Sequence, residues 1–209
     1  MNPFTFSSRR ALAALLVALL VAFLAACASP SPAPVLLTLP PASAPVTTGA
    51  PSAVASAPLL AVRRVGIPEY MVARRVRYRA DASTLAEWPN TYCAERIEIG
   101  VSREFVSALR QQLPGWSMCD TNCGDQPSAL TLQVDLVPMD YLRSTQRLQA
   151  RARITLSGAG AVPKVLQTQE LAYDIPASAD TAQGQAQAMA ALIRQVAAAA
   201  APLVTAAKP

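Results

Sequence analysis

A long apolar run near the N-terminus constrains this chain most, because it removes that segment from the folded domain. Arg9 and Arg10 precede an unbroken apolar run of 16 residues at positions 11–26. Basic residues, a run of this length and small residues at its end are the layout of a secretory signal peptide. A helix that spans a membrane needs roughly 20 residues. We therefore predict that residues 1–26 are a cleaved signal peptide, with an uncleaved membrane anchor as the alternative.

The residues at the end of this run predict the cleavage site. Leu24-Ala25-Ala26-Cys27 resembles the lipobox of bacterial lipoproteins, in which a large aliphatic residue and two small ones precede the acceptor cysteine. The resemblance implies that a diacylglyceryl group is attached to the Cys27 thiol, that cleavage then frees the Cys27 amine, and that this amine is acylated, with palmitate as the expected chain. One acyl chain holds a protein on a membrane only marginally, so several give a stable anchor. We expect no cofactor other than this covalent lipid.

The mature chain is predicted to carry one folded domain behind a flexible tether. Residues 28–57 are rich in Ala, Ser, Pro and Thr and contain no charged or aromatic side chain. A segment of this composition buries too little surface to fold, so residues 27–57 are assigned to the lipidated cysteine and its tether. Residues 35–39 are either a short strand that pairs with the domain or an apolar patch in the tether. Residues 58–206 are long enough for one domain with its own core.

Hydrophobic periodicity predicts an α+β fold for this domain. The predicted elements, in chain order, are strands at 59–65 and 75–79, a helix at 91–113, strands at 130–136, 148–156 and 165–175, and a helix at 181–204. Apolar residues recur every four positions in the first helix, and Pro114 with Gly115 ends it. The last three strands alternate apolar and polar residues, which indicates a sheet with one packed face. We therefore predict a mostly antiparallel sheet packed by two main helices.

Three cysteines remain besides the lipidated Cys27 after the predicted cleavage, and an exported chain meets an oxidising compartment. Cys119 and Cys123 flank three residues and could close a small loop. Cys93 lies near the start of the predicted helix and Cys119 lies beyond its end, which would separate the two by roughly 25 Å. A Cys119–Cys123 disulfide is the favoured pairing. The third thiol is then free or pairs between chains.

Arginines are the one concentrated polar feature of the domain. Six of them fall within 17 residues: Arg63, Arg64, Arg74, Arg75, Arg77 and Arg79. One interpretation is an anion-facing or partner-binding edge that meets phospholipid head groups or an acidic protein surface. The other, which we prefer, is a solvated strand face that discourages edge-to-edge aggregation.

Catalytic and nucleic-acid-binding chemistry is not indicated. The chain contains no histidine, so a Ser-His-Asp or Cys-His mechanism cannot be assembled from it. Its carboxylates are scattered, no phosphate-binding glycine loop follows a strand, and a zinc site would need histidines or a second cysteine pair. Without Arg9 and Arg10 the chain has 16 basic and 13 acidic side chains, an excess of only +3. We predict a protein that is not an enzyme, holds no metal and binds no nucleic acid.

Several segments in order resemble the auxiliary lipoprotein of ABC-type lipid transport systems, the PqiC-like family. These are Leu37-Thr38-Leu39-Pro40-Pro41, the strand and turn Val65-Gly66-Ile67-Pro68-Glu69-Tyr70-Met71, the arginine strand Val76-Arg77-Tyr78-Arg79, Trp88 before the first long helix, Val134-Asp135-Leu136, Arg151-Ala152-Arg153, and an alanine-rich final helix. The resemblance covers most of residues 35–205 and stands behind a lipobox.

The resemblance implies a non-catalytic role in the cell envelope. Such lipoproteins lie on the periplasmic face of the outer membrane and act with an MCE-domain protein, a permease and an ATPase to move lipid between membranes, and the chain could assemble as a homo-oligomer. Ala28 follows the lipidated cysteine in place of aspartate, which points to the outer membrane in many Gram-negative bacteria. The alternative function is an adaptor that binds peptidoglycan or activates a cell-wall synthase.

Overall fold

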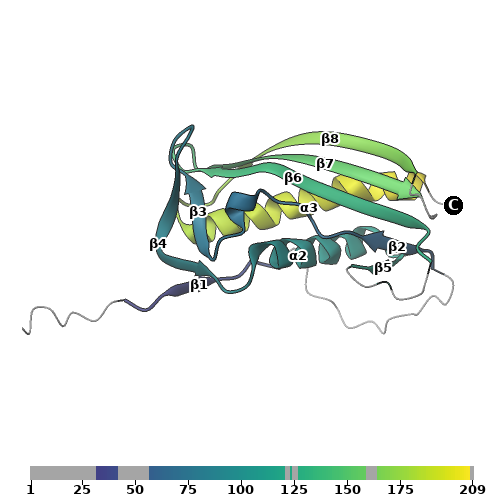
Figure 1. Cartoon of the computed structure of the whole chain (residues 1–209), viewed down its shortest axis with the longest axis horizontal. Coiled ribbons are helices and arrows are strands. Elements are labelled where there is room, and N and C mark those ends of the chain that lie inside the picture. Colours follow the sequence, from purple (N-terminus) through teal and green to yellow (C-terminus); the bar gives the residue numbers. More distant parts are fainter. Residues whose placement is uncertain (1–31, 42–56, 121–122, 124–126, 159–163, 208–209) are drawn as a thin grey trace, which may run out of the picture. The chain divides into compact units, whose positions relative to one another are not determined.

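Within the residues that the structure describes, eight strands form one mixed sheet (Figure 1). This computed structural model describes residues 32–41, 57–120, 123, 127–158 and 164–207. The elements are β1 (Val35–Leu37), β2 (Leu59–Val62), the short 3-10 helix η1 (Glu69–Met71), β3 (Arg75–Arg79), β4 (Leu85–Cys93), α2 (Ile97–Gln112), β5 (Ser117–Cys119), β6 (Leu130–Leu142), β7 (Arg147–Gly158), β8 (Val165–Pro176) and α3 (Ala182–Ala206). The predicted signal peptide lies outside the described residues.

The long strand β6 organises the sheet. On one side it pairs antiparallel with β7 along its whole length, and β7 pairs antiparallel with β8. Three segments pair with the other edge of β6, all in parallel orientation. They are β2, Gly66 through a single bridge to Asp135, and the end of β3. The α+β prediction is therefore confirmed. The antiparallel prediction holds for β6 to β8, whereas the shorter pairs β1–β4, β2–β5 and β2–β6 are parallel.

Both helices cover one face of this sheet (Figure 1). α3 contacts β7 and β8, and α2 contacts α3. The inward side chains of β6 and β7 alternate with outward ones, apart from an irregularity at Val137 and Pro138, so Leu132, Leu148 and Ile154 are buried in the core under the helices. α3 is long and apolar enough to cross a membrane, but 56% of its most apolar window is buried inside the domain, as in a core helix.

The predicted first helix began too early. Residues 85–93 form β4, and α2 begins only at Ile97. β4 pairs with β3 on one side and with β1 on the other, and strand pairing satisfies the backbone groups that an early helical turn would have used. Aromatic and β-branched residues such as Trp88, Thr91 and Tyr92 favour this strand.

The predicted tether was too long. Residues 35–37 form β1, which pairs in parallel with β4, and Leu39 is buried in the core. This resolves the choice left open for residues 35–39 in favour of a strand. The compact unit begins at Pro34 rather than at residue 58, because burial of Leu39 and pairing of β1 hold this segment on the domain.

Gly184 in the first turn of α3 is expected to tolerate no side chain. A Cβ at this position would lie 2.2 Å from the backbone oxygen of Ala179. The turn is fixed because the hydroxyl of the N-cap Thr181 accepts a hydrogen bond from the Gly184 amide at 3.0 Å. Gly184→Ala should lower the free energy of unfolding by about 1–3 kcal/mol, which is a Tm decrease of about 2–4 °C per kcal/mol for a domain of this size.

Gly115 provides the matched control, because a Cβ there would meet nothing within 4 Å. Gly115→Ala should shift the Tm by no more than a surface substitution does, about 0.5 kcal/mol or less in unfolding free energy. Equal Tm values for the two variants in a thermal melt followed by circular dichroism would contradict the packing described at Gly184.

Candidate functional site

The structure does not gather the predicted arginine cluster on one surface. Arg74, Arg75 and Arg77 line one groove beside β1, and Arg63 and Arg64 line another beside β2. Arg79 lies against Asp140 of β6. The two interpretations of the cluster therefore have to be judged residue by residue.

Arg79 is held by a carboxylate from a distant part of the chain. Its Nη2 donates to Oδ1 of Asp140 at 3.1 Å, and its Nε lies 3.0 Å from Oδ2 of the same residue. The Tyr70 hydroxyl donates to the same Oδ1 at 2.9 Å. Burial raises the pKa of Tyr70, and its hydrogen bond to Asp140 raises that pKa further. Arg79 thus ties β3 to β6 and is not presented to an external anion.

Arg77 belongs to a second network that joins β3, β4 and α3. Its Nη1 donates to the Tyr70 carbonyl oxygen at 2.9 Å. Its own carbonyl oxygen accepts from Nε2 of Gln185 at 2.7 Å, and the Gln185 Oε1 accepts from Nε1 of Trp88 at 2.7 Å. Gln185 is fully buried. Arg143 covers the Trp88 ring, with its guanidinium carbon 4.7 Å from the ring centre. These contacts hold β3, β4 and α3 together within the domain.

The groove beside β1 is the surface where exposed arginine and apolar side chains meet. Its volume is about 600 Å³, and it is lined by Pro34, Leu36, Ala73, Arg74, Arg75, Arg77, Glu87, Asn90 and Tyr92. Arg75 stacks on the Tyr92 ring at 5.2 Å and lies 3.3 Å from a Glu87 carboxylate oxygen. Arg74 is exposed and makes no side-chain hydrogen bond or ion pair with a described residue. Arg74 and Arg75 can therefore meet an external group.

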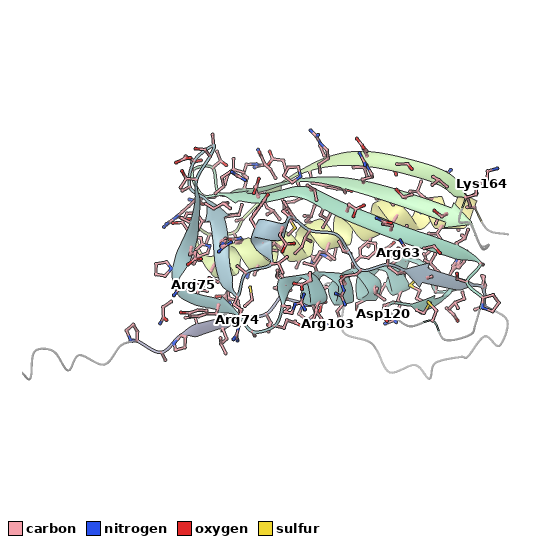
Figure 2. All side chains as sticks on the ribbon, viewed as in Figure 1. Arg63, Arg74, Arg75, Arg103, Asp120 and Lys164 are labelled. Atoms are coloured by element: carbon pink, nitrogen blue, oxygen red, sulfur yellow. A yellow bond between two sulfur atoms is a disulfide. The ribbon has the colours of Figure 1, made fainter. Side chains whose placement is uncertain are left out.

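The groove beside β2 has a different composition. Its volume is about 630 Å³, and it is lined by Ala61, Val62, Arg63, Arg64, Asp120, Cys123, Thr131, Gln133 and Ser157. Arg63 and Arg64 are exposed, and among the described residues their side chains have no ion-pair partner. Figure 2 shows Arg63 and Asp120 at the β2 end of the domain, away from Arg74 and Arg75. This groove is lined by polar and apolar side chains in similar measure.

The face of the sheet that the helices do not cover is wet and charge-paired. Arg153 pairs with Glu170 at 2.7 Å and Arg147 pairs with Asp174 at 2.7 Å, each across β7 and β8. A shallow hollow of about 380 Å³ lies on this face between Asp135 and Arg151. Exposed ion pairs contribute little stability, so this face is suited to solvent or to a polar partner.

Cys119 and Cys123 form a disulfide in the structure, with their Cα atoms 5.2 Å apart, in agreement with the pairing favoured by the short loop. The remaining cysteine of the described residues, Cys93, is unpaired. Cys93 ends β4 and does not start a helix, so the helix length invoked to separate it from Cys119 was wrong. Burial raises the pKa of the Cys93 thiol, and the nearby charge of Glu95 raises it further.

Cys93 should therefore react slowly in the folded protein. Because the thiolate is the nucleophile, its alkylation by iodoacetamide should be slower in buffer than in urea, and should still rise with pH above the pKa of an ordinary thiol. Peptide mass spectrometry after labelling without reductant checks this, and the urea sample is the control. Equal rates in both solvents, or labelling of Cys119 and Cys123, would contradict the structure.

The predicted lipidation residue Cys27 and the lipobox residues Leu24, Ala25 and Ala26 lie outside the described residues, and their role stays a prediction. Among the residues that are described, no three histidine, cysteine or carboxylate side chains converge to hold a metal ion. Sequence reasoning missed Asp140, Glu87 and Gln185, the partners of Arg79, Arg75 and Arg77. No local pattern marks them, because each is brought to its arginine by the fold.

Comparisons with known proteins identify solved structures with a similar fold. A comparison with curated proteins gave no match. The crystal structure of an uncharacterized protein matches with a TM-score of 0.66 at 17% identity, covering 83% of this chain and 99% of that one. The crystal structure of protein XCC0632 from Xanthomonas campestris, of the DUF330 family, matches with a TM-score of 0.56 at 13% identity, covering 71% of this chain and 84% of that one. These two likenesses show the fold.

The family itself is shown by the sequence. The family model described as the ABC-type transport auxiliary lipoprotein component matches residues 37–201, which include every described element from Leu37 to the last turns of α3. The chain therefore belongs to the ABC-type transport auxiliary lipoprotein family.

Proposed function

We propose that this chain is an outer-membrane lipoprotein, lipidated on Cys27 and facing the periplasm, that serves an MCE-type ABC system moving lipid between the two membranes. The family match over residues 37–201 carries the proposal, because that family is an auxiliary component of ABC-type transport. The lipobox at Leu24-Ala25-Ala26-Cys27 supports the anchor. The role is non-catalytic, and its partners are an MCE-domain protein, a permease and an ATPase.

The described surface supports a docking role. The grooves beside β1 and β2 are open and are lined by charged as well as apolar side chains. Ligand pockets that enclose a small molecule are mostly apolar and concave. Open grooves lined by both charged and apolar side chains, together with a solvent-exposed sheet face, are suited to binding another protein in a fixed orientation. Electrostatic complementarity would then set the partner's orientation and specificity.

Affinity purification from cross-linked envelope tests this function. A C-terminal tag on the full chain should recover the MCE-domain protein together with the permease and the ATPase, and the protein should sediment with outer-membrane fractions on a sucrose gradient. Arg63→Gln/Arg64→Gln removes the two positive charges of the groove beside β2, and Arg147→Gln/Arg151→Gln removes two from the sheet face. Reduced recovery of the partners by one of these two variants would map the docking surface.

Two results would contradict the proposal. One is recovery of no transport subunit from envelope in which the tagged protein itself is abundant. The other is specific retention on isolated sacculi, which would favour the alternative adaptor that binds peptidoglycan or activates a cell-wall synthase.

A further inference from the structure

We propose that the surface around β1 docks on the leaflet that holds the lipid of Cys27. We call this surface the β1 face and define it by Leu36, Arg74, Arg75 and Tyr92, which line one groove. The inference rests on the lipid anchor of the proposed function, and its occupant is a membrane surface that contains anionic lipid. No other part of the proposed function is required.

The length of chain between the anchor and the domain supports this assignment. Because β1 is paired with β4, only residues 28–34 separate Cys27 from the first strand. An extended chain spans at most about 3.3–3.6 Å per residue, so the start of β1 stays within roughly 30 Å of the lipidated cysteine. The anchor thus concentrates the β1 face at the membrane, whatever the remainder of the domain binds.

The exposed side chains of the β1 face have the chemistry of a membrane-binding surface. Leu36 is 61% exposed, the most exposed large hydrophobic side chain in the described part of the chain, and Tyr92, its partner in the strand pairing, lies on the same side of the sheet. Next to them, Arg74 and Arg75 are exposed at the mouth of the same groove as Leu36. Aliphatic residues beside arginines bind the headgroup boundary through burial of apolar area and attraction to anionic lipid.

The open edge of β1 is a second reason for a covering surface. β1 is the terminal strand of the sheet and, among the described residues, pairs only with β4. An edge strand with exposed aliphatic side chains is prone to pair with other chains unless it is covered. Figure 2 shows Arg74 and Arg75 at this end of the domain, whereas Arg63 lies at the β2 end. The two arginine pairs therefore provide a charge-matched comparison on one molecule.

Hydrogen–deuterium exchange of the full lipidated protein in vesicles tests the inference. One vesicle is neutral phosphatidylcholine and the other contains phosphatidylglycerol, so the acyl anchor is the same in both. Amides of residues 34–38 and 73–76 should exchange at least about fivefold more slowly on the anionic vesicle, since each arginine near an anionic surface contributes about that factor. Arg74→Gln/Arg75→Gln should abolish the difference, and Arg63→Gln/Arg64→Gln should leave it unchanged.

Equal exchange on both vesicles would overturn the inference, and so would protection that depends on the protein-to-lipid ratio, because that dependence would assign the β1 face to a second copy of the chain. Loss of protection in the Arg63→Gln/Arg64→Gln variant would overturn it as well. The proposed function is tested separately: protection on anionic vesicles with no transport subunit recovered from envelope refutes the transport role and supports the membrane contact. The converse result refutes the membrane contact alone.

Discussion

Cys27→Ala is expected to abolish both lipid attachment and removal of residues 1–26. The lipobox resemblance places thiol lipidation before cleavage, so a chain without this thiol should keep its apolar segment and carry no acyl chain. Intact-mass spectrometry and metabolic labelling with palmitate measure the two effects. Cys93→Ala, which removes the unpaired cysteine of the described domain, should retain both the label and the cleavage.

A wild-type chain that is cleaved but carries no lipid would contradict the anchor. The protein would then be an ordinary secreted one, and the docking of the β1 face would lose the proximity on which it depends. The fold and the family would be unaffected, because both concern residues beyond Pro34. This measurement therefore separates the anchor and the membrane docking that depends on it from the fold and the family.

Trp88→Ala is expected to be the most destabilising single substitution in the polar network, at about 3–5 kcal/mol. Trp88 is only 7% exposed, and its ring packs against Tyr78 at 4.9 Å between centres. Its loss would also leave the Gln185 oxygen buried without its donor, and a buried unsatisfied polar group costs about 1–3 kcal/mol. Urea unfolding followed by circular dichroism measures the effect.

Trp116→Ala is the comparison for this substitution, since Trp116 is half-buried at the margin of the core. Its truncation should cost clearly less than that of Trp88. If both variants lost the same stability, the network of Trp88, Gln185 and Arg77 would not be the joint between the sheet and α3 that its hydrogen bonds indicate. A native-like urea midpoint for Trp88→Ala would contradict the burial itself.

The elements that could be predicted are those whose own hydrophobic pattern determines their secondary structure. β6 and β7 have one packed and one wet face, so their alternation predicted them. The second half of β8 was predicted from the alternation of Leu171, Tyr173 and Ile175, and α3 begins within one residue of its expected start. β4 was missed because its pairing with β1 and β3, and not its own periodicity, makes it a strand. β5 has three residues and depends on β2 for its pairing.

The arginine cluster shows why the site was harder to predict than the fold. Arg75, Arg77 and Arg79 occupy every second position of β3, yet they meet partners from two elements. Arg75 and Arg77 pair with Glu87 of β4, whereas Arg79 pairs with Asp140 of β6. Asp140 is 61 positions from Arg79, and Gln185 is 108 positions from Arg77. Such distances depend on tertiary packing, which no local motif records. The short link from Cys27 to β1 could not be predicted either, because it depends on the pairing of β1 with β4.

The shared edge of β6 sets an order for folding during export. Among the described residues β2 pairs only with β5 and β6, and Leu60 pairs with Leu130, 70 positions later. Contacts of long sequence separation form slowly, because the loop must close before the pairing stabilises it. β2 must therefore wait for β6 to be translocated, whereas β1, β3 and β4 can pair with one another earlier. Lipid attachment at Cys27 can precede that event, so the chain would complete its sheet while already held at a membrane surface.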